Sequence, residues 1–144
     1  IWVAQTGARR RFGHEGAKVF RQTGRDLAER MENALRRLPP GDVILVGGDI
    51  PELRRIHLER AFDCLRCSPI VFGPAVDGGF WLVGLRRTRI PQRPLFGRDV
   101  RWSSEHALRD VLAGLPIQAA LADTLHDVDD GAAFHAHRRR GTDA

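Results

Sequence analysis

Hydrophobic residues along the chain form strand-like runs separated by helical patterns. Ile1–Ala4 and Lys18–Arg21 have the length and composition of short strands, and Val43–Val46 is an apolar run rich in β-branched residues. Between them, five apolar residues recur at the spacing of one helical face: Leu27, Met31, Ala34, Leu35 and Leu38. Because Val43–Val46 shows no alternation with polar residues, we expect both of its faces to be buried in the centre of a parallel or mixed sheet. Strand, helix and buried strand in close succession predict βαβ construction.

The second half of the chain continues this alternation. The expected elements are a helix over 52–65, strands over 69–74 and 80–85 joined by a turn at 75–79, a helix ending near 112, a strand over 116–121 and a short helix over 132–137. Ser103 or Ser104 has the side chain of an N-cap for the helix that ends near Leu112. The run 80–85 is apolar throughout, which predicts a strand covered on both faces. The pattern as a whole predicts an α/β fold.

Composition and charge are those of an ordinary globular protein. The chain has 144 residues, of which 42% are hydrophobic and 28% charged, so we expect a single domain over 1–137 followed by a basic tail over 138–144. The formal net charge of +5 comes from the two ends, because residues 19–133 hold 16 arginines and 16 acidic residues. Terminal clusters of this kind, on a neutral body, argue against a nucleic-acid partner. No apolar run approaches the roughly 20 residues of a membrane span.

The two cysteines, Cys64 and Cys67, have the spacing of a redox pair or of half a zinc site. They lie near the end of a helical pattern, whereas a redox pair needs a helix start to lower the thiol pKa. The sequence has no second cysteine pair to complete a four-ligand zinc site. We therefore expect two reduced cysteines in a cytoplasmic protein.

One carboxylate follows the apolar run directly. Gly47 and Gly48 end that run and precede Asp49, while Pro51 keeps the next residues out of a helix. Asp49 should therefore lie just beyond the carboxyl end of a strand, where open α/β sheets bind their ligands. A carboxylate there can hold a divalent cation against phosphate oxygens. The alternative is that Asp49 only closes the turn or caps the following helix.

Five blocks of sequence, taken together in this order, resemble one bacterial family. They are Gln22-x-Gly24-x-Asp26-Leu27-x-x-Arg30-Met31, Gly48-Asp49-x-Pro51-x-Leu53, Gly73-Pro74-Ala75-x-Asp77-Gly78-Gly79-Phe80-x-Leu82-x-Gly84-Leu85, Leu95-Phe96 with Trp102-Ser103-Ser104, and Asp127-Val128-Asp129. The arrangement resembles the radical-SAM/selenodomain-associated transferases, a glycosyltransferase-like branch of the GT-A nucleotide-diphospho-sugar transferase fold. It is also similar to the nucleotidyltransferases that make molybdenum-cofactor dinucleotides and to the 2-phospholactate guanylyl transfer enzyme. The Gly-Pro-Ala-x-Asp-Gly-Gly block is the most specific part.

The resemblance implies a GT-A-like fold with a mixed, mainly parallel sheet flanked by helices. Family members open with a strand and a Lys-x-Pro-x-x-Gly-x-x-Lys-Thr-Arg-Leu loop, the counterpart of the phosphate loop in related nucleotidyltransferases. Nothing like this loop precedes Ile1, so we expect an N-terminally truncated form of the fold. A lost first strand would expose a neighbouring strand edge and favour a homo-oligomer.

The resemblance also implies a cofactor, a divalent metal ion (Mg²⁺ or Mn²⁺). Asp49 would hold the ion together with Asp127 or Asp129, and the ion would neutralise the diphosphate of the donor as it leaves. For Asp127 and Asp129, the alternative is an acidic helix N-terminus, which the helix dipole stabilises without any metal.

The nucleotide of the donor would contact two of the blocks. The implied residues are Gln22, Gly24, Asp26, Gly48 and Asp49. For Asp26, capping of the following helix explains the residue nearly as well.

The acceptor would lie against the Gly-rich turn and the Trp-Ser pair. Asp77 would act as base or accept a hydrogen bond from an acceptor hydroxyl, and Gly78 and Gly79 would let the acceptor approach the backbone. The alternative for Asp77 is a hairpin turn stabilised by its own side chain. Trp102, beside Ser103, would line the acceptor pocket. The alternative is a tryptophan of the hydrophobic core, which is the more frequent place for this residue.

These roles together predict a metal-dependent glycosyltransferase or nucleotidyltransferase. It would use a nucleotide-activated donor and a small-molecule acceptor that the sequence does not identify. The alternative is a catalytically incompetent GT-A-like domain that serves as a binding or interaction module, because the phosphate loop expected before Ile1 is missing from the sequence.

Overall fold

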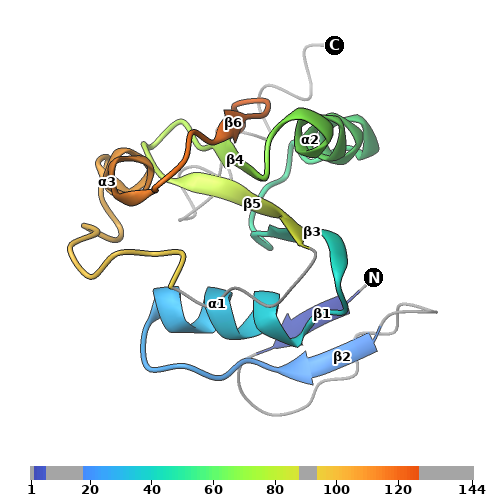
Figure 1. Cartoon of the computed structure of the whole chain (residues 1–144), viewed down its shortest axis with the longest axis horizontal. Coiled ribbons are helices and arrows are strands. Elements are labelled where there is room, and N and C mark those ends of the chain that lie inside the picture. Colours follow the sequence, from blue (N-terminus) through green and yellow to red (C-terminus); the bar gives the residue numbers. More distant parts are fainter. Residues whose placement is uncertain (1, 6–17, 88–93, 127–144) are drawn as a thin grey trace. The chain divides into compact units, whose positions relative to one another are not determined.

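The computed structural model describes residues 2–5, 18–87 and 94–126, and the chain divides into two compact units, Ile1–Pro39 and Pro40–Ala144. The elements, in chain order, are β1 (Trp2–Gln5), β2 (Lys18–Arg21), α1 (Leu27–Arg37), β3 (Gly41–Val46), α2 (Arg55–Cys67), β4 (Ile70–Pro74), β5 (Phe80–Arg87), α3 (Ala107–Gly114) and β6 (Ala120–Leu121) (Figure 1). The expected basic tail and the expected helix over 132–137 lie outside the described residues.

The first unit is a parallel strand pair and one helix. β1 pairs with β2 in parallel, from Trp2 opposite Lys18 to Gln5 opposite Arg21. Asp26 caps α1, because its carboxylate accepts the Glu29 N–H at 2.8 Å. The helix ends at Arg37, just before the first of two prolines. The two strands and the helix expected in this part of the sequence are confirmed.

The second unit is built on a four-stranded mixed sheet in the order β3-β5-β4-β6. β5 runs antiparallel to both of its neighbours, and only the short β4/β6 pair is parallel. The sheet is therefore mixed, as expected, but within this unit the antiparallel pairs predominate. The expectation of a central Val43–Val46 is wrong, because β3 lies at the edge of this sheet and those residues are only half-buried.

The central strand is β5, whose residues Trp81–Leu85 are all buried. Its continuous apolar run was expected to be covered on both faces, and this is confirmed. One face receives α2, whose Ala61 and Leu65 are fully buried. Gly84 leaves room for the side chains around it, since a Cβ there would lie 2.6 Å from the side chain of Val71 on β4 and 3.4 Å from that of Leu65 on α2.

α2 and α3 differ in detail from the sequence pattern. α2 begins at Arg55 rather than at position 52, and it leaves the apolar side chains of Ile56 and Phe62 exposed. α3 begins at Ala107, so the expected N-cap at Ser103 or Ser104 is wrong. The hydroxyl of Ser104 instead donates to the Arg101 carbonyl oxygen at 2.6 Å and stabilises a turn before the helix.

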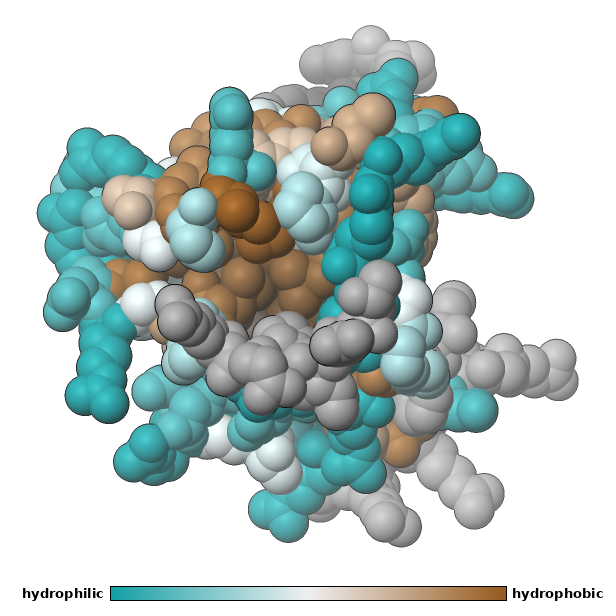
Figure 2. Space-filling view, in the orientation of Figure 1, coloured by the Kyte–Doolittle hydropathy of each residue, from teal (hydrophilic) through white to brown (hydrophobic). Residues whose placement is uncertain are grey.

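Two further expectations concern the surface and the cysteines. Cys64 and Cys67 both lie in the last turn of α2 and are free. Within the described ranges, no helix is long and apolar enough to cross a membrane. Hydrophilic side chains project from the face seen in Figure 2, with an area of hydrophobic atoms visible between them.

Candidate functional site

One end of the four-stranded sheet gathers the segments that the sequence marked as functional. Val46, the last residue of β3, lies opposite Leu82, and Pro74, the last residue of β4, lies opposite Phe80. Because both pairs are antiparallel, the carboxyl ends of β3 and β4 meet at the amino end of β5. β6 is parallel to β4, so the chain that leaves β6 runs toward the same end.

The loop after β3 presents Asp49 to solvent. The Gly47 N–H donates to the Trp81 carbonyl oxygen at 2.9 Å, which continues the strand pairing for one more residue. Ile50 is buried in the core and anchors the loop, while Asp49 is exposed. A Cβ on Gly47 would lie 2.9 Å from Asp49 Oδ1, so a larger residue at position 47 would displace that carboxylate. The structure thus places Asp49 just beyond a strand end, as the sequence predicted.

The segment after β6 is fastened to this loop and to the turn after β4. The Leu125 N–H donates to the Pro74 carbonyl oxygen, and the Val76 N–H donates to the Leu125 carbonyl oxygen, both at 3.1 Å. The backbone N–H of His126 donates to Glu52 Oε2, and its Nδ1 lies 3.1 Å from the same oxygen. Glu52 therefore links the Asp49 loop to the stretch of chain that immediately precedes Asp127.

The metal ligands expected after this stretch, Asp127 and Asp129, lie outside the described residues. Among the residues that are described, no group of three or more His, Cys, Asp or Glu side chains could hold a metal ion. The carboxylate side chains of Asp49, Asp127 and Asp129 nevertheless suit Mg²⁺ or Mn²⁺, which prefer carboxylate oxygens as ligands. In the described part, the hydrogen bond from the His126 N–H to Glu52 holds His126, the residue before Asp127, beside the Asp49 loop.

The turn between β4 and β5 holds Asp77. Asp77 Oδ1 accepts the Gly79 N–H at 2.8 Å, so the side chain stabilises its own turn through one oxygen. Asp77 itself is exposed. Gly78 has a φ of 92° and its carbonyl oxygen accepts the Leu108 N–H at 3.1 Å, so the turn is joined to the start of α3. A Cβ on Gly78 would lie 2.2 Å from the Glu105 carbonyl oxygen, so only glycine fits this approach.

Trp102 lies in an aromatic cluster beside that turn. Its ring centroid is 5.5 Å from that of Phe96 and 6.2 Å from that of Phe80, both at steep angles. Trp102 is half-buried, so part of its ring is accessible. Ser103 is exposed and has a φ of 55°, a conformation that non-glycine residues adopt rarely.

A bidentate ion pair fixes the chain around Trp102 and Ser103. Arg101 Nη2 lies 2.7 Å from Asp110 Oδ1, and Arg101 Nε lies 2.8 Å from Asp110 Oδ2. The hydrogen bonds from the Arg101 side chain hold the pKa of Asp110 well below its usual value. Sequence reasoning missed this pair, as it missed Glu52 and His126, because partners nine and 74 positions apart leave no local pattern.

Three of the residues that we expect to contact the nucleotide belong to the first unit: Gln22, Gly24 and Asp26. Gln22 is half-buried, and Asp26 is committed to its cap. Gly24 has a φ of 139°, and a Cβ there would lie 2.6 Å from the Arg30 backbone nitrogen, so glycine is required by the local backbone alone. The Arg25 side chain beside them donates to the Glu29 carboxylate and lowers the pKa of Glu29 to about 2.

Comparison with known proteins assigns the chain to a family and a fold. Residues 1–104 match the family described as "uncharacterized protein conserved in bacteria" (DUF2064), and the chain belongs to it. No curated protein matches the chain. A solved structure described as a "putative nucleotide-diphospho-sugar transferase" from Desulfovibrio desulfuricans G20 has the same fold, with a TM-score of 0.81 and 21% sequence identity. The comparison covers 96% of this chain, which spans 65% of the length of that protein.

The likeness confirms the expected fold class. The chain has an α/β fold with a mixed sheet flanked by helices, like that of the nucleotide-diphospho-sugar transferase neighbour. At 21% identity the likeness extends to the fold and not to the chemistry.

Proposed function

We propose that this protein is a metal-dependent glycosyltransferase or nucleotidyltransferase that uses a nucleotide-activated donor. The observation that carries the proposal is the meeting of three segments at one end of the sheet. These are the exposed Asp49 loop, the Asp77 turn, and the stretch that leads through His126 to Asp127. Ligands of open α/β sheets bind at the carboxyl ends of strands, where the first two of these segments lie.

The metal ion would be held by Asp49 with Asp127 or Asp129. Bound there, Mg²⁺ or Mn²⁺ would neutralise the negative charge of the donor diphosphate. In support, Glu52 accepts the His126 backbone N–H and so fixes the residue before Asp127 to the loop that carries Asp49.

The acceptor would lie against the Asp77 turn. One oxygen of Asp77 is occupied by the Gly79 N–H, which fixes the carboxylate in place. The other oxygen would accept the proton of an acceptor hydroxyl. The accessible part of the Trp102 ring, held beside Phe80 at the start of β5, would form one wall of the acceptor pocket. Ser103 and the backbone at Gly78 and Gly79 would line the approach.

In the first unit, Gln22 and the backbone at Gly24 would contact the nucleotide. Asp26 contributes through its cap, which holds the start of α1 next to Gly24. The fold neighbour's description as a nucleotide-diphospho-sugar transferase supports a nucleotide-sugar donor. Such donors are made in the cytoplasm, which is where we propose that the protein acts.

The experiment that tests the proposal measures thermal stability with a panel of nucleoside diphosphate sugars and triphosphates, with and without Mn²⁺ or Mg²⁺. A donor present at about 100 times its Kd should stabilise the protein by about 2.7 kcal/mol. The stabilisation should require the metal and be lost in Asp49→Asn. Asp63→Asn is the matched control, because it removes the same charge from the exposed surface of α2.

Two outcomes would contradict the proposal. A flat response of the wild-type protein to every donor and metal would indicate a GT-A-like binding module without catalysis. An equal loss in Asp49→Asn and Asp63→Asn would show that the metal acts through general charge and not through Asp49.

A further inference from the structure

The net positive charge of the chain equals the net charge of its first unit. Residues 1–39 contain nine basic and four acidic side chains, which give a net charge of +5. Residues 40–144 contain fourteen of each and are neutral. The first unit, with 39 residues, therefore has a net charge of +5 and would attract an anionic ligand.

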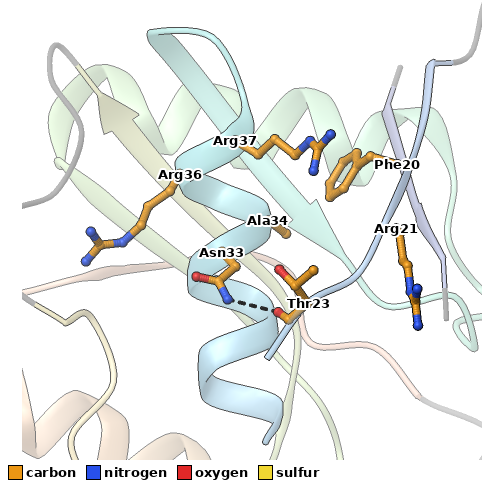
Figure 3. Close-up of a pocket in the computed structure, with 7 residues that line it drawn as sticks. All are labelled: Phe20, Arg21, Thr23, Asn33, Ala34, Arg36 and Arg37. Atoms are coloured by element: carbon orange, nitrogen blue, oxygen red, sulfur yellow. Dashed lines mark hydrogen bonds between the residues drawn. The ribbon is translucent and has the colours of Figure 1, made fainter. Parts of the chain in front are cut away.

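The first unit also contains a pocket of about 350 Å³. It is formed between the end of β2 and the second half of α1, and its lining residues are Phe20, Arg21, Thr23, Asn33, Ala34, Arg36 and Arg37. Figure 3 shows that these side chains come from β2, from the chain just after it and from α1. None of the described residues that line it is acidic, and the volume is within the range of small-molecule sites.

The floor and one wall of the pocket are held in place by contacts. Phe20 and Ala34 are buried and form an apolar floor. The guanidinium of Arg37 lies over the Phe20 ring, 5.2 Å from its centroid, which orients the charge above this floor (Figure 3). The Asn33 amide donates to the Thr23 carbonyl oxygen at 2.9 Å, which joins the helix to the chain after β2.

Two arginines of this pocket have no acidic partner among the residues that the structure describes. Within the ranges that the structure describes, five arginines form ion pairs with carboxylates: Arg25, Arg55, Arg60, Arg66 and Arg101. Arg21 and Arg37 form none with any described residue, and both are exposed. Their guanidinium groups present the planar donors that match phosphate oxygens.

We propose that this pocket binds the phosphate or diphosphate group of a small molecule through Arg21 and Arg37. The Thr23 hydroxyl and the second N–H of the Asn33 amide would complete the set of donors. Arg36 contributes charge only, since its side chain extends along the other side of α1 in Figure 3. This site uses no residue of the proposed transferase centre and does not depend on the transferase proposal.

The test is calorimetric titration of the whole chain with inorganic pyrophosphate in EDTA, so that no metal-dependent binding contributes. Saturable binding with one site per chain is expected. Arg21→Gln and Arg37→Gln should each weaken the binding about tenfold, the effect of losing one charged hydrogen bond. Arg25→Gln is the matched control, because it removes one charge from the same unit outside the pocket, and it should change the Kd by less than about twofold.

Two further ligands identify the source of the phosphate group. A nucleoside diphosphate that competes with pyrophosphate, and binds more tightly, would identify a nucleotide as the occupant and support the proposal. A phosphorylated sugar that competes in the same way would support it with a different occupant. A single-stranded oligonucleotide that binds with steep salt dependence, and is not displaced by pyrophosphate, would overturn it in favour of a nucleic-acid surface.

Two results with pyrophosphate itself would also overturn the proposal. One is the absence of saturable binding to the wild-type chain. The other is an equal loss of affinity in Arg25→Gln and in the two pocket variants, which would indicate general attraction to the +5 unit. Amide shifts in NMR spectra, confined to Thr23, Asn33 and their neighbours on titration, provide a readout that remains interpretable if a variant folds poorly.

Discussion

At the scale of single residues, several candidate side chains already have a structural task. Asp26 caps α1, and Asp77 accepts the N–H of Gly79 within its own turn. The sequence left open whether Asp26 caps the helix and whether Asp77 stabilises its own turn. The structure shows that each side chain makes the hydrogen bond in question. A carboxylate has two oxygens, so the turn bond of Asp77 leaves one for an acceptor. Substitutions that keep one task and remove the other can separate the two.

Asp77→Asn should keep the turn and lose the chemistry. The asparagine oxygen can still accept the Gly79 N–H, but the neutral amide cannot act as a base. We expect turnover with the donor identified by stability measurements to fall about 100-fold or more, the usual effect of removing a general base. Asp77→Ala should in addition lower the free energy of unfolding by about 1 kcal/mol, because the turn hydrogen bond is lost. Full activity in Asp77→Asn would restrict Asp77 to the turn.

Gly78→Ala should destabilise the protein strongly. The added Cβ would lie 2.2 Å from the Glu105 carbonyl oxygen, at a φ of 92° that alanine rarely adopts. We expect the free energy of unfolding to fall by about 3 kcal/mol in urea denaturation. Gly97→Ala is the control, because a Cβ at position 97 would meet no atom within 4 Å. Equal effects of the two substitutions would mean that the turn and the start of α3 are not in contact.

At the scale of elements, the local sequence patterns predicted which segments form strands and helices. They predicted less well which position each strand takes in the sheet. The apolar runs of β3 and β5 look alike in sequence, yet β5 is central and β3 lies at the edge of its sheet. Pairing order depends on contacts between distant residues, which a periodicity does not contain. The start of α3 was misplaced for a related reason. Ser104 has the side chain of an N-cap but serves a turn fixed by Arg101, which is itself bound to Asp110.

The Arg101–Asp110 pair predicts a pH dependence of stability. The folded state lowers the pKa of Asp110, so the unfolded state binds the proton more readily and stability rises with pH. The contribution should be fully present above about pH 4, the ordinary aspartate pKa, and should be lost as the pH falls through the lower pKa of the folded state. The melting temperature of Asp110→Asn should therefore lie below that of the wild type at pH 7 and approach it on acidification. A constant difference between the two proteins from pH 7 to pH 2 would contradict this account.

Glu52 should act on the proposed metal site through His126. Glu52→Ala removes the acceptor of the His126 backbone N–H, so the chain that leads to Asp127 loses its attachment to the Asp49 loop. We expect Mn²⁺ affinity, measured by electron paramagnetic resonance, to fall about tenfold, the lower end of the effect of such supporting residues. Glu59→Ala, on the exposed surface of α2, is the control. Unchanged Mn²⁺ affinity in Glu52→Ala would show that Asp127 and Asp129 need no such support.

At the scale of the whole molecule, the two units contribute different properties. The larger unit contains a cluster of buried apolar residues between the sheet and α2: Ile50, Ala61, Leu65, Val71, Trp81, Leu82 and Leu125. The smaller unit carries the net positive charge and, among its described residues, buries only Phe20, Ala34 and Leu35. Composition alone predicted a globular protein, and the sequence blocks predicted its fold. The separation of charge from core could not be predicted without knowing where one compact unit ends and the other begins.

This difference in buried core predicts two levels of protection from amide hydrogen exchange. Opening free energies follow the amount of apolar packing that each segment must give up. In the intact chain, the amides of β4 and β5 should exchange slowest, because these strands are buried and β5 is paired on both sides. The amides of α1 should open with a free energy lower by about 2 kcal/mol, which is a roughly 30-fold difference in protection. Because Phe20 and Ala34 form the floor of the phosphate pocket, pyrophosphate should slow exchange in α1 and leave β5 unchanged. Equal protection of α1 and β5 without ligand would show that the two units open together as one.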